Sequence, residues 1–207
     1  MAGTSPLTGV LFNMVKDKEY ISVRNHYQLQ RGNADLSNVK DAAVMQGVVT
    51  DIDALKKGEA KVTLKNICYV IKISAKVPSS AGTVKAVTLQ AANADGSSAP
   101  FCFAGWTRVD SFGIKYGNPW DYITLGLGSD FDGRTYGTGI SPDSSGYITA
   151  YLVGYTGEAQ TLPAGATLEV ELTIDSSTRF SKSSTPLASD LTLEPGKMYR
   201  INVDMTK

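Results

Sequence analysis

The sequence predicts an all-β fold, an antiparallel Greek-key β-sandwich of the transthyretin-like or immunoglobulin-like kind with about seven strands. Apolar and polar residues alternate with period two near the C-terminus, from Leu168 to Asp175, which is typical of a half-buried strand. Similar runs recur from residue 60 onward, separated by turn residues such as Asn93, Asp95 and Gly96. None of the connections has the pattern of a crossover helix, which favours antiparallel pairing.

Seven segments carry the strand pattern. They are residues 61–64, 67–77, 84–91, 122–127, 147–153, 167–174 and 198–205. The longest of them is apolar at every odd position, so we expect a central strand whose odd-numbered side chains lie in the core. These side chains are Ile67, Tyr69, Ile71, Ile73, Ala75 and Val77.

Two cysteines are present, Cys68 and Cys102. Cys68 falls on the even, less apolar face of the 67–77 strand, whereas Cys102 lies between two phenylalanines. Nothing in these contexts brings the two residues face to face, so we expect thiols rather than a disulfide bond between them.

Residues 1–57 differ in character from the rest of the chain. We expect residues 1–57 to be a partial or truncated N-terminal region, with short β or irregular segments, and residues 58–207 to form the C-terminal sandwich domain. Within the first region, residues 35–48 have apolar side chains at roughly helical spacing. Asp35 or Ser37 is the expected N-cap of a short helix, and an irregular loop is the alternative.

The composition restricts the kind of partner. With 20 basic and 20 acidic residues the formal net charge is zero, which argues against nucleic acid as a partner. No apolar run approaches the roughly 20 residues of a transmembrane helix. The N-terminus also lacks the pattern of a signal peptide, so either the protein is cytosolic or an export signal has been removed, and removal is the favoured interpretation.

The residues give no catalytic signature, and we expect a protein that is not an enzyme and has no cofactor or metal. The single histidine, His26, lies far in the sequence from either cysteine, and no zinc-ligand spacing is present. Asp130 and Asp132 have the spacing of the start of a calcium loop, but a turn stabilised by Asp side chains is the favoured interpretation.

A Gly-rich segment contains several aromatic residues, and it is the candidate sugar-stacking site. Exposed aromatic rings beside carboxylates suit a carbohydrate-binding surface module, although packing in the core or at its rim is the favoured alternative. Hydrolysis by a carboxylate pair is a further hypothesis. The stacking candidates are Trp106, Tyr116 and Trp120, with Tyr122, Asp110 and Asp121 nearby.

Several segments together resemble the C-terminal half of the fimbrillin family, pilin subunits and related lipoproteins of gut and oral anaerobes. They are VTLKNICYVIKI (62–73), TVKAVTL (83–89), AGWT (104–107), YITL (122–125), TAYLV (149–153) and LEPGKMYRINVD (193–204). The last resembles the family's ending, a Pro-Gly-Lys turn followed by an alternating strand. The resemblance covers residues 60–207 and depends on strand order and turns.

The resemblance implies a structural subunit or accessory protein of surface fimbriae or pili, with a role in adhesion. Such a protein would be extracellular, attached to the cell outer membrane through fimbriae, and would assemble with other pilin subunits by strand addition. Glycans or proteins of host or bacterial surfaces are the other implied partners. The candidate assembly strand carries Tyr199, Ile201, Val203 and Met205, whose apolar face leads us to expect an integral strand and not a loose tail.

Overall fold

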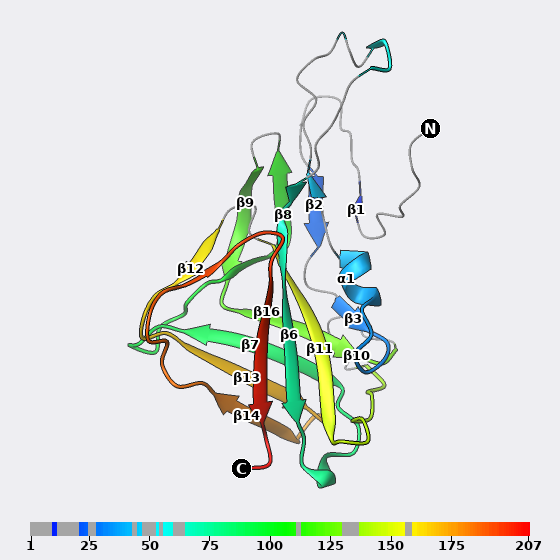
Figure 1. Ribbon diagram of the computed structural model, residues 1–207, viewed down its shortest axis with the longest axis vertical. Helices are drawn as coiled ribbons and strands as arrows, with labels where there is room; N and C mark the ends of the chain where they lie inside the picture. Colours follow the sequence, from blue (N-terminus) through cyan, green and yellow to red (C-terminus); the bar gives the residue numbers. More distant parts are fainter. Residues whose placement is uncertain are drawn as a thin grey trace.

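The computed structural model describes residues 10–11, 21–24, 28–42, 45–46, 53, 56–59, 65–110, 113–129, 137–155 and 159–207. The described chain consists mostly of strands arranged in several sheets, so the predicted all-β class is confirmed. Two large sheets lie face to face, and the C-terminus lies at the end of β16 (Figure 1). No helix among the described residues has the length and apolar character needed to cross a membrane.

The first large sheet has the strand order β1-β2-β8-β11-β6-β16, with β9 paired to β8. It contains the two strands with the longest mutual pairing, β6 and β11, and β16 lies at its edge. The bounds are β1 (Val10–Leu11), β2 (Ile21–Arg24), β6 (Cys68–Lys76), β8 (Cys102–Asp110), β9 (Gly113–Trp120), β11 (Tyr147–Tyr155) and β16 (Met198–Asp204).

The second large sheet has the order β14-β13-β7-β10-β3, and two short strand pairs accompany the large sheets. Its bounds are β3 (Gln28–Gln30), β7 (Ala86–Ala92), β10 (Tyr122–Leu127), β13 (Thr167–Thr173) and β14 (Arg179–Ser183). The remaining elements are β4 (Met45–Gln46) with β5 (Lys65–Asn66), β12 (Gln160–Leu162) with β15 (Leu191–Leu193), the helix α1 (Ser37–Ala42) and the 3₁₀ turn η1 (Ser79–Ala81).

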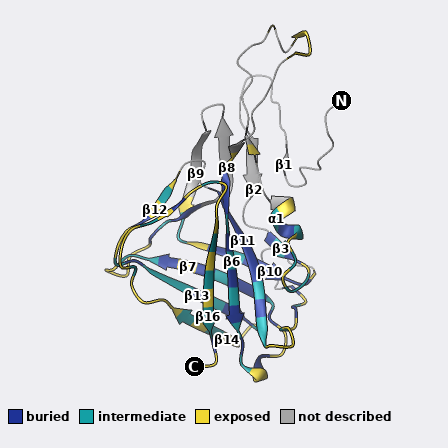
Figure 2. Cartoon of the chain, viewed as in Figure 1, coloured by how far each residue is buried: buried dark blue, intermediate teal, exposed yellow. Residues whose placement is uncertain are grey.

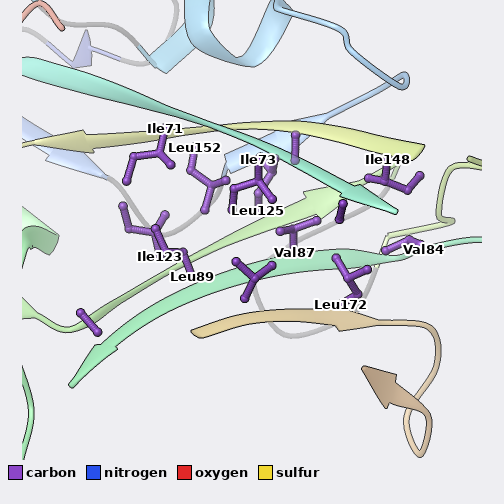
Figure 3. Packing of buried hydrophobic residues seen from close by; sticks show 14 of the residues in the cluster. Ile71, Ile73, Val84, Val87, Leu89, Ile123, Leu125, Ile148, Leu152 and Leu172 are labelled. Carbon is purple, nitrogen blue, oxygen red and sulfur yellow. The ribbon is translucent and has the colours of Figure 1, made fainter. Parts of the chain in front are cut away.

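The core lies between the two large sheets, and each sheet contributes its inward-facing side chains. Burial alternates with period two along β6, whereas β11 is buried continuously from Ala150 to Tyr155 (Figure 2). The first sheet contributes Ile71, Ile73, Ile148 and Leu152, and the second contributes Val87, Leu89, Ile123, Leu125 and Leu172 (Figure 3).

The predicted central strand is confirmed as β6, which pairs with β11 on one side and β16 on the other. β6 is one residue shorter at each end than predicted, and the six odd-numbered apolar side chains of residues 67–77 are all buried. Cys68 lies on the even, less apolar face of β6, as expected, and it is nevertheless buried. Its pairing partner Tyr155 is buried as well, so both faces of the sheet are covered at this end.

Two strand pairs differ from the antiparallel prediction. β16 runs parallel to β6, and β3 runs parallel to β10. Side-chain alternation reports which face of a strand is buried but is the same for both strand directions, so the sequence pattern did not reveal this difference.

The sheets contain more strands than the seven predicted. Six of the predicted segments correspond to β6, β7, β10, β11, β13 and β16, whereas residues 61–64 lie outside the described residues. Strands without a matching prediction include β8, β9, β12, β14 and β15.

The N-terminal region contributes β1 and β2 to the first sheet, β3 to the second, β4 to a short strand pair, and the helix α1. The helix predicted within residues 35–48 is α1, and it is shorter than the pattern that predicted it. The Asp35 carboxylate accepts hydrogen bonds from the Ser37 backbone N–H (2.9 Å) and hydroxyl (2.7 Å), which lower the pKa of Asp35. The domain boundary at residue 57 stays a prediction, and Gln28–Gln30 already belongs to the second sheet.

Candidate interaction sites

The edge of β11 that faces away from β6 is covered mainly by side chains instead of a neighbouring strand. β11 pairs with β8 only at Tyr155, where it meets Phe103. Over residues 147–153 the backbone of this edge bonds instead to four amide side chains from the N-terminal region, which we call the amide clasp. The amide clasp consists of Gln28, Gln30, Asn33 and Asn38.

The two glutamines of the amide clasp bind β11 as a strand would. The Gln28 amide donates to the Val153 carbonyl (2.7 Å) and accepts from the Val153 N–H (2.8 Å). Gln30 donates to the Thr149 carbonyl (2.7 Å) and accepts from the Tyr151 N–H (3.0 Å). Both glutamines are buried, and their own strand β3 pairs with β10 in the opposite sheet.

The two asparagines bond to the remaining backbone groups of this edge of β11. Asn33 donates to the Tyr147 carbonyl (2.8 Å) and accepts from the Thr149 N–H (2.7 Å). Asn38, at the second position of α1, donates to the Tyr151 carbonyl. Each inner backbone group on this edge therefore has a partner, which matters because a buried unsatisfied group costs about 1–3 kcal/mol.

Sequence analysis did not identify the amide clasp. Its bonds join residues more than a hundred positions apart, and polar residues in an irregular segment give no periodic signal of burial. The one local clue is the spacing of Gln28 and Gln30 on either side of Leu29, which is the alternation of a strand.

The candidate assembly strand is β16, and the prediction that it is an integral strand is confirmed. It pairs with β6 along its whole length, from Met198 opposite Val70 to Asp204 opposite Lys76. Its odd-numbered side chains face the core: Met205 is buried, and Tyr199, Ile201 and Val203 pack against the core while half-buried. The Tyr199 hydroxyl also donates to the Thr192 carbonyl (2.9 Å).

The other edge of β16 is open among the described residues, since β16 ends the strand order of its sheet. Bonds at the two ends, from the Val70 N–H to the Lys197 carbonyl and from the Met205 N–H to the Lys76 carbonyl, show that odd-numbered residues of β16 bond to β6. The backbone groups of Arg200 and Asn202 therefore point to the open edge.

One end of this edge is occupied by a charged side chain. The Lys182 ammonium donates to the Asp204 carbonyl at 3.1 Å. A lysine placed along an edge is a common way to limit unwanted strand pairing. The accessible stretch of the edge is therefore centred on Arg200 and Asn202, whose side chains are exposed.

The aromatic candidates fall in two groups. Trp120 stacks on Tyr122, with ring centroids 4.8 Å apart and an interplanar angle of 29°. Trp120 is half-buried and packs against the core, as the favoured packing interpretation expects, while Tyr122 is 39% exposed. Trp106 and Tyr116 lie on β8 and β9 at positions whose side chains the structure does not describe, so their role in stacking stays a prediction.

The two cysteines are not joined in a disulfide bond, as expected. Both are buried, and burial together with the nearby Asp121 carboxylate raises the pKa of the Cys102 thiol. A buried thiol with a raised pKa is a poor nucleophile, because the thiolate is the reactive form.

Among the described residues, no three of His, Cys, Asp and Glu gather closely enough to hold a metal ion. His26 and the pair Asp130 and Asp132 lie outside the described residues. A scan against known protein families and a search of curated proteins find no match to this chain.

Proposed function

We propose that this protein is a structural subunit or accessory protein of surface fimbriae, an extracellular module that contributes to adhesion and assembles with other pilin subunits by strand addition. The resemblance of residues 60–207 to fimbrillins supports the proposal. The finer fold that goes with it is a Greek-key sandwich of the transthyretin-like or immunoglobulin-like kind, and two sheets around one core support that assignment.

The observation that carries the proposal is the contrast between two edges of the same sheet. The amide clasp fills the edge of β11, whereas the outer edge of β16 presents the backbone groups of Arg200 and Asn202. An extended segment of another subunit would gain main-chain hydrogen bonds along this open edge. Each such bond contributes about 0.5–1.5 kcal/mol net, so several are needed for stable assembly.

The integral position of β16 restricts how it takes part in assembly. Its inner face packs against the core, and leaving the sheet would expose Tyr199, Ile201 and Val203 further. Each apolar side chain of this size loses up to about 1.5–3 kcal/mol on full exposure. The proposed role of β16 is therefore to accept a strand from another subunit while it stays paired with β6.

The test uses Asn202→Pro, because proline removes a backbone N–H at the centre of the open edge, where the proposed partner strand would bond. Proline is tolerated on an edge strand where the N–H faces solvent. We expect the variant to remain a folded monomer by circular dichroism, and immunogold electron microscopy of producing cells to show fibres with wild type but not with the variant. The matched control, Asn202→Ala, keeps the N–H and should assemble. Fibres of normal length with Asn202→Pro would contradict the proposal.

A second candidate function, a carbohydrate-binding surface module, is favoured by one observation. That observation is the exposed ring of Tyr122, held in a stack with Trp120 beside a polar sheet face.

A further inference from the structure

The outward face of the second sheet carries an ordered polar surface. Pairing places Tyr122 (β10) beside Gln90 (β7), Gln90 beside Glu169 (β13), and Glu169 beside Ser183 (β14). Directly paired residues share one face of a sheet, so these four side chains form a row across four strands. The row spans three inter-strand spacings of about 4.8 Å, or roughly 14 Å.

A second row lies beside the first and has the same character. It contains Thr124, Thr88, Glu171 and Ser181. We call the two rows together the polar face. The polar face ends at the second row, because Ala86 and Thr173 in the next row are buried.

We infer that the polar face, with the Trp120–Tyr122 stack at one end, is a binding site for a short neutral oligosaccharide. The first argument is the aromatic stack. One ring of the pair, Tyr122, is 39% exposed, and its contact with Trp120 holds it in a defined orientation. A rigid exposed ring offers the flat apolar surface that the C–H face of a pyranose packs against.

The second argument is the set of hydrogen-bonding groups beside this ring. Gln90 is exposed and lies 3.5 Å from the Asp121 carboxylate, and Glu169 accepts from the Ser183 hydroxyl at 3.0 Å. The Thr88 and Thr124 hydroxyls are 2.9 Å apart. Sugar hydroxyls both donate and accept hydrogen bonds. The amide, carboxylate and hydroxyl groups of this surface offer both kinds of partner.

The charge of the polar face selects the class of sugar. Asp121, Glu169 and Glu171 bring three carboxylates to this region, and one cation, Arg179, is paired with Glu171 at 3.0 Å. The surface is therefore net negative, which disfavours uronic, sialylated or sulfated sugars. It also lacks the exposed aliphatic side chains that form the centre of a protein interface, which favours a glycan over a protein.

This inference rests on the second candidate function, carbohydrate binding, and names its substrate class; it is independent of the fimbrial function, because the polar face and the β16 edge belong to different sheets. The test measures binding of xylohexaose, cellohexaose and N-acetylchitohexaose by calorimetry and tryptophan fluorescence, with hexagalacturonate as the anionic comparison. We expect at least one neutral hexasaccharide to bind with a Kd below about 1 mM, and hexagalacturonate to bind at least about tenfold more weakly.

Two variants locate the site. We expect Tyr122→Ala to weaken binding at least about tenfold, while Tyr147→Ala, on the outward face of the other sheet, leaves it unchanged. Gln90→Ala, a change at an exposed residue that keeps the fold, should also weaken binding. The inference is overturned if no neutral hexasaccharide binds, if hexagalacturonate binds as tightly, or if Gln90→Ala and Tyr147→Ala have the same affinity.

Discussion

At the scale of single residues, Tyr69 packs directly against Gly154. The two residues are paired between β6 and β11, and a Cβ on Gly154 would lie 2.2 Å from the Tyr69 Cζ. Tyr69 is fully buried, and its hydroxyl donates to the Phe101 carbonyl at 2.7 Å. Glycine is thus required here for space beneath the ring and not for an unusual backbone angle.

Gly154→Ala should therefore destabilise the protein by overpacking, at a cost of about 1–3 kcal/mol. Urea denaturation of the variant and the wild type measures the difference. The effect should shrink in a Tyr69→Leu background, where the ring is gone, because the two sites are directly coupled. Equal costs in both backgrounds would show that Tyr69 is not the cause.

A second residue-scale prediction concerns Asp175, in the turn between β13 and β14. Its carboxylate accepts hydrogen bonds from the Ser177 N–H (2.8 Å), the Ser177 hydroxyl (2.9 Å) and the Thr178 N–H (2.7 Å). These bonds lower the pKa of Asp175 from 3.8 to about 2.

Because the folded pKa is below the unfolded value, the contribution of Asp175 to stability is present above pH 3.8 and is lost as the pH falls toward 2. An NMR titration of the Ser177 amide should show a transition near pH 2 that is absent in Asp175→Asn. A transition near pH 3.8 would mean that the turn bonds do not favour the charged carboxylate.

At the scale of elements, the amide clasp attaches the N-terminal region to β11 through hydrogen bonds. Gln30→Leu removes the partner of the Tyr151 N–H on a buried edge and should cost about 1–3 kcal/mol. The matched control is Gln90→Leu, which changes an exposed glutamine and should stay within about 0.5 kcal/mol. Thermal or urea unfolding compares the two. Equal effects would show that the amide clasp adds nothing to stability.

Elements with a clean alternation could be predicted from the sequence, and β6 and β16 are the clearest cases. Each has one face in a single core, so burial and sequence have the same period. Residues 102–110 and 113–120 form β8 and β9 without such alternation, and their pairing is broken by irregular register near Arg108. The direction of β16 and the amide clasp depend on contacts between distant segments, which no local pattern contains.

In the candidate sites, too, one feature could be predicted from the local sequence and another could not. The position of the Trp120 and Tyr122 rings close together follows from their spacing of two residues. The polar face does not, because it combines residues from β7, β10, β13 and β14 through strand pairing. Aspartates followed two positions later by serine or threonine, as at Asp35, Asp95 and Asp175, do predict local turns, and each accepts a bond from that residue.

At the scale of the whole molecule, two edges of one sheet differ in how their backbone groups are satisfied. The edge of β11 is closed by the amide clasp, and the edge of β16 is open in the free chain and is the proposed site of strand addition. Backbone amides report this difference directly, because a hydrogen-bonded buried amide exchanges with solvent far more slowly than an exposed one.

Residue-resolved hydrogen exchange on the free chain and on the assembled fibre is the most direct test. In the free chain, the amides of Thr149, Tyr151 and Val153 should be protected, and those of Arg200 and Asn202 should exchange rapidly. In the fibre, Arg200 and Asn202 should become protected as well. Rapid exchange at Arg200 and Asn202 in the fibre would contradict the claim.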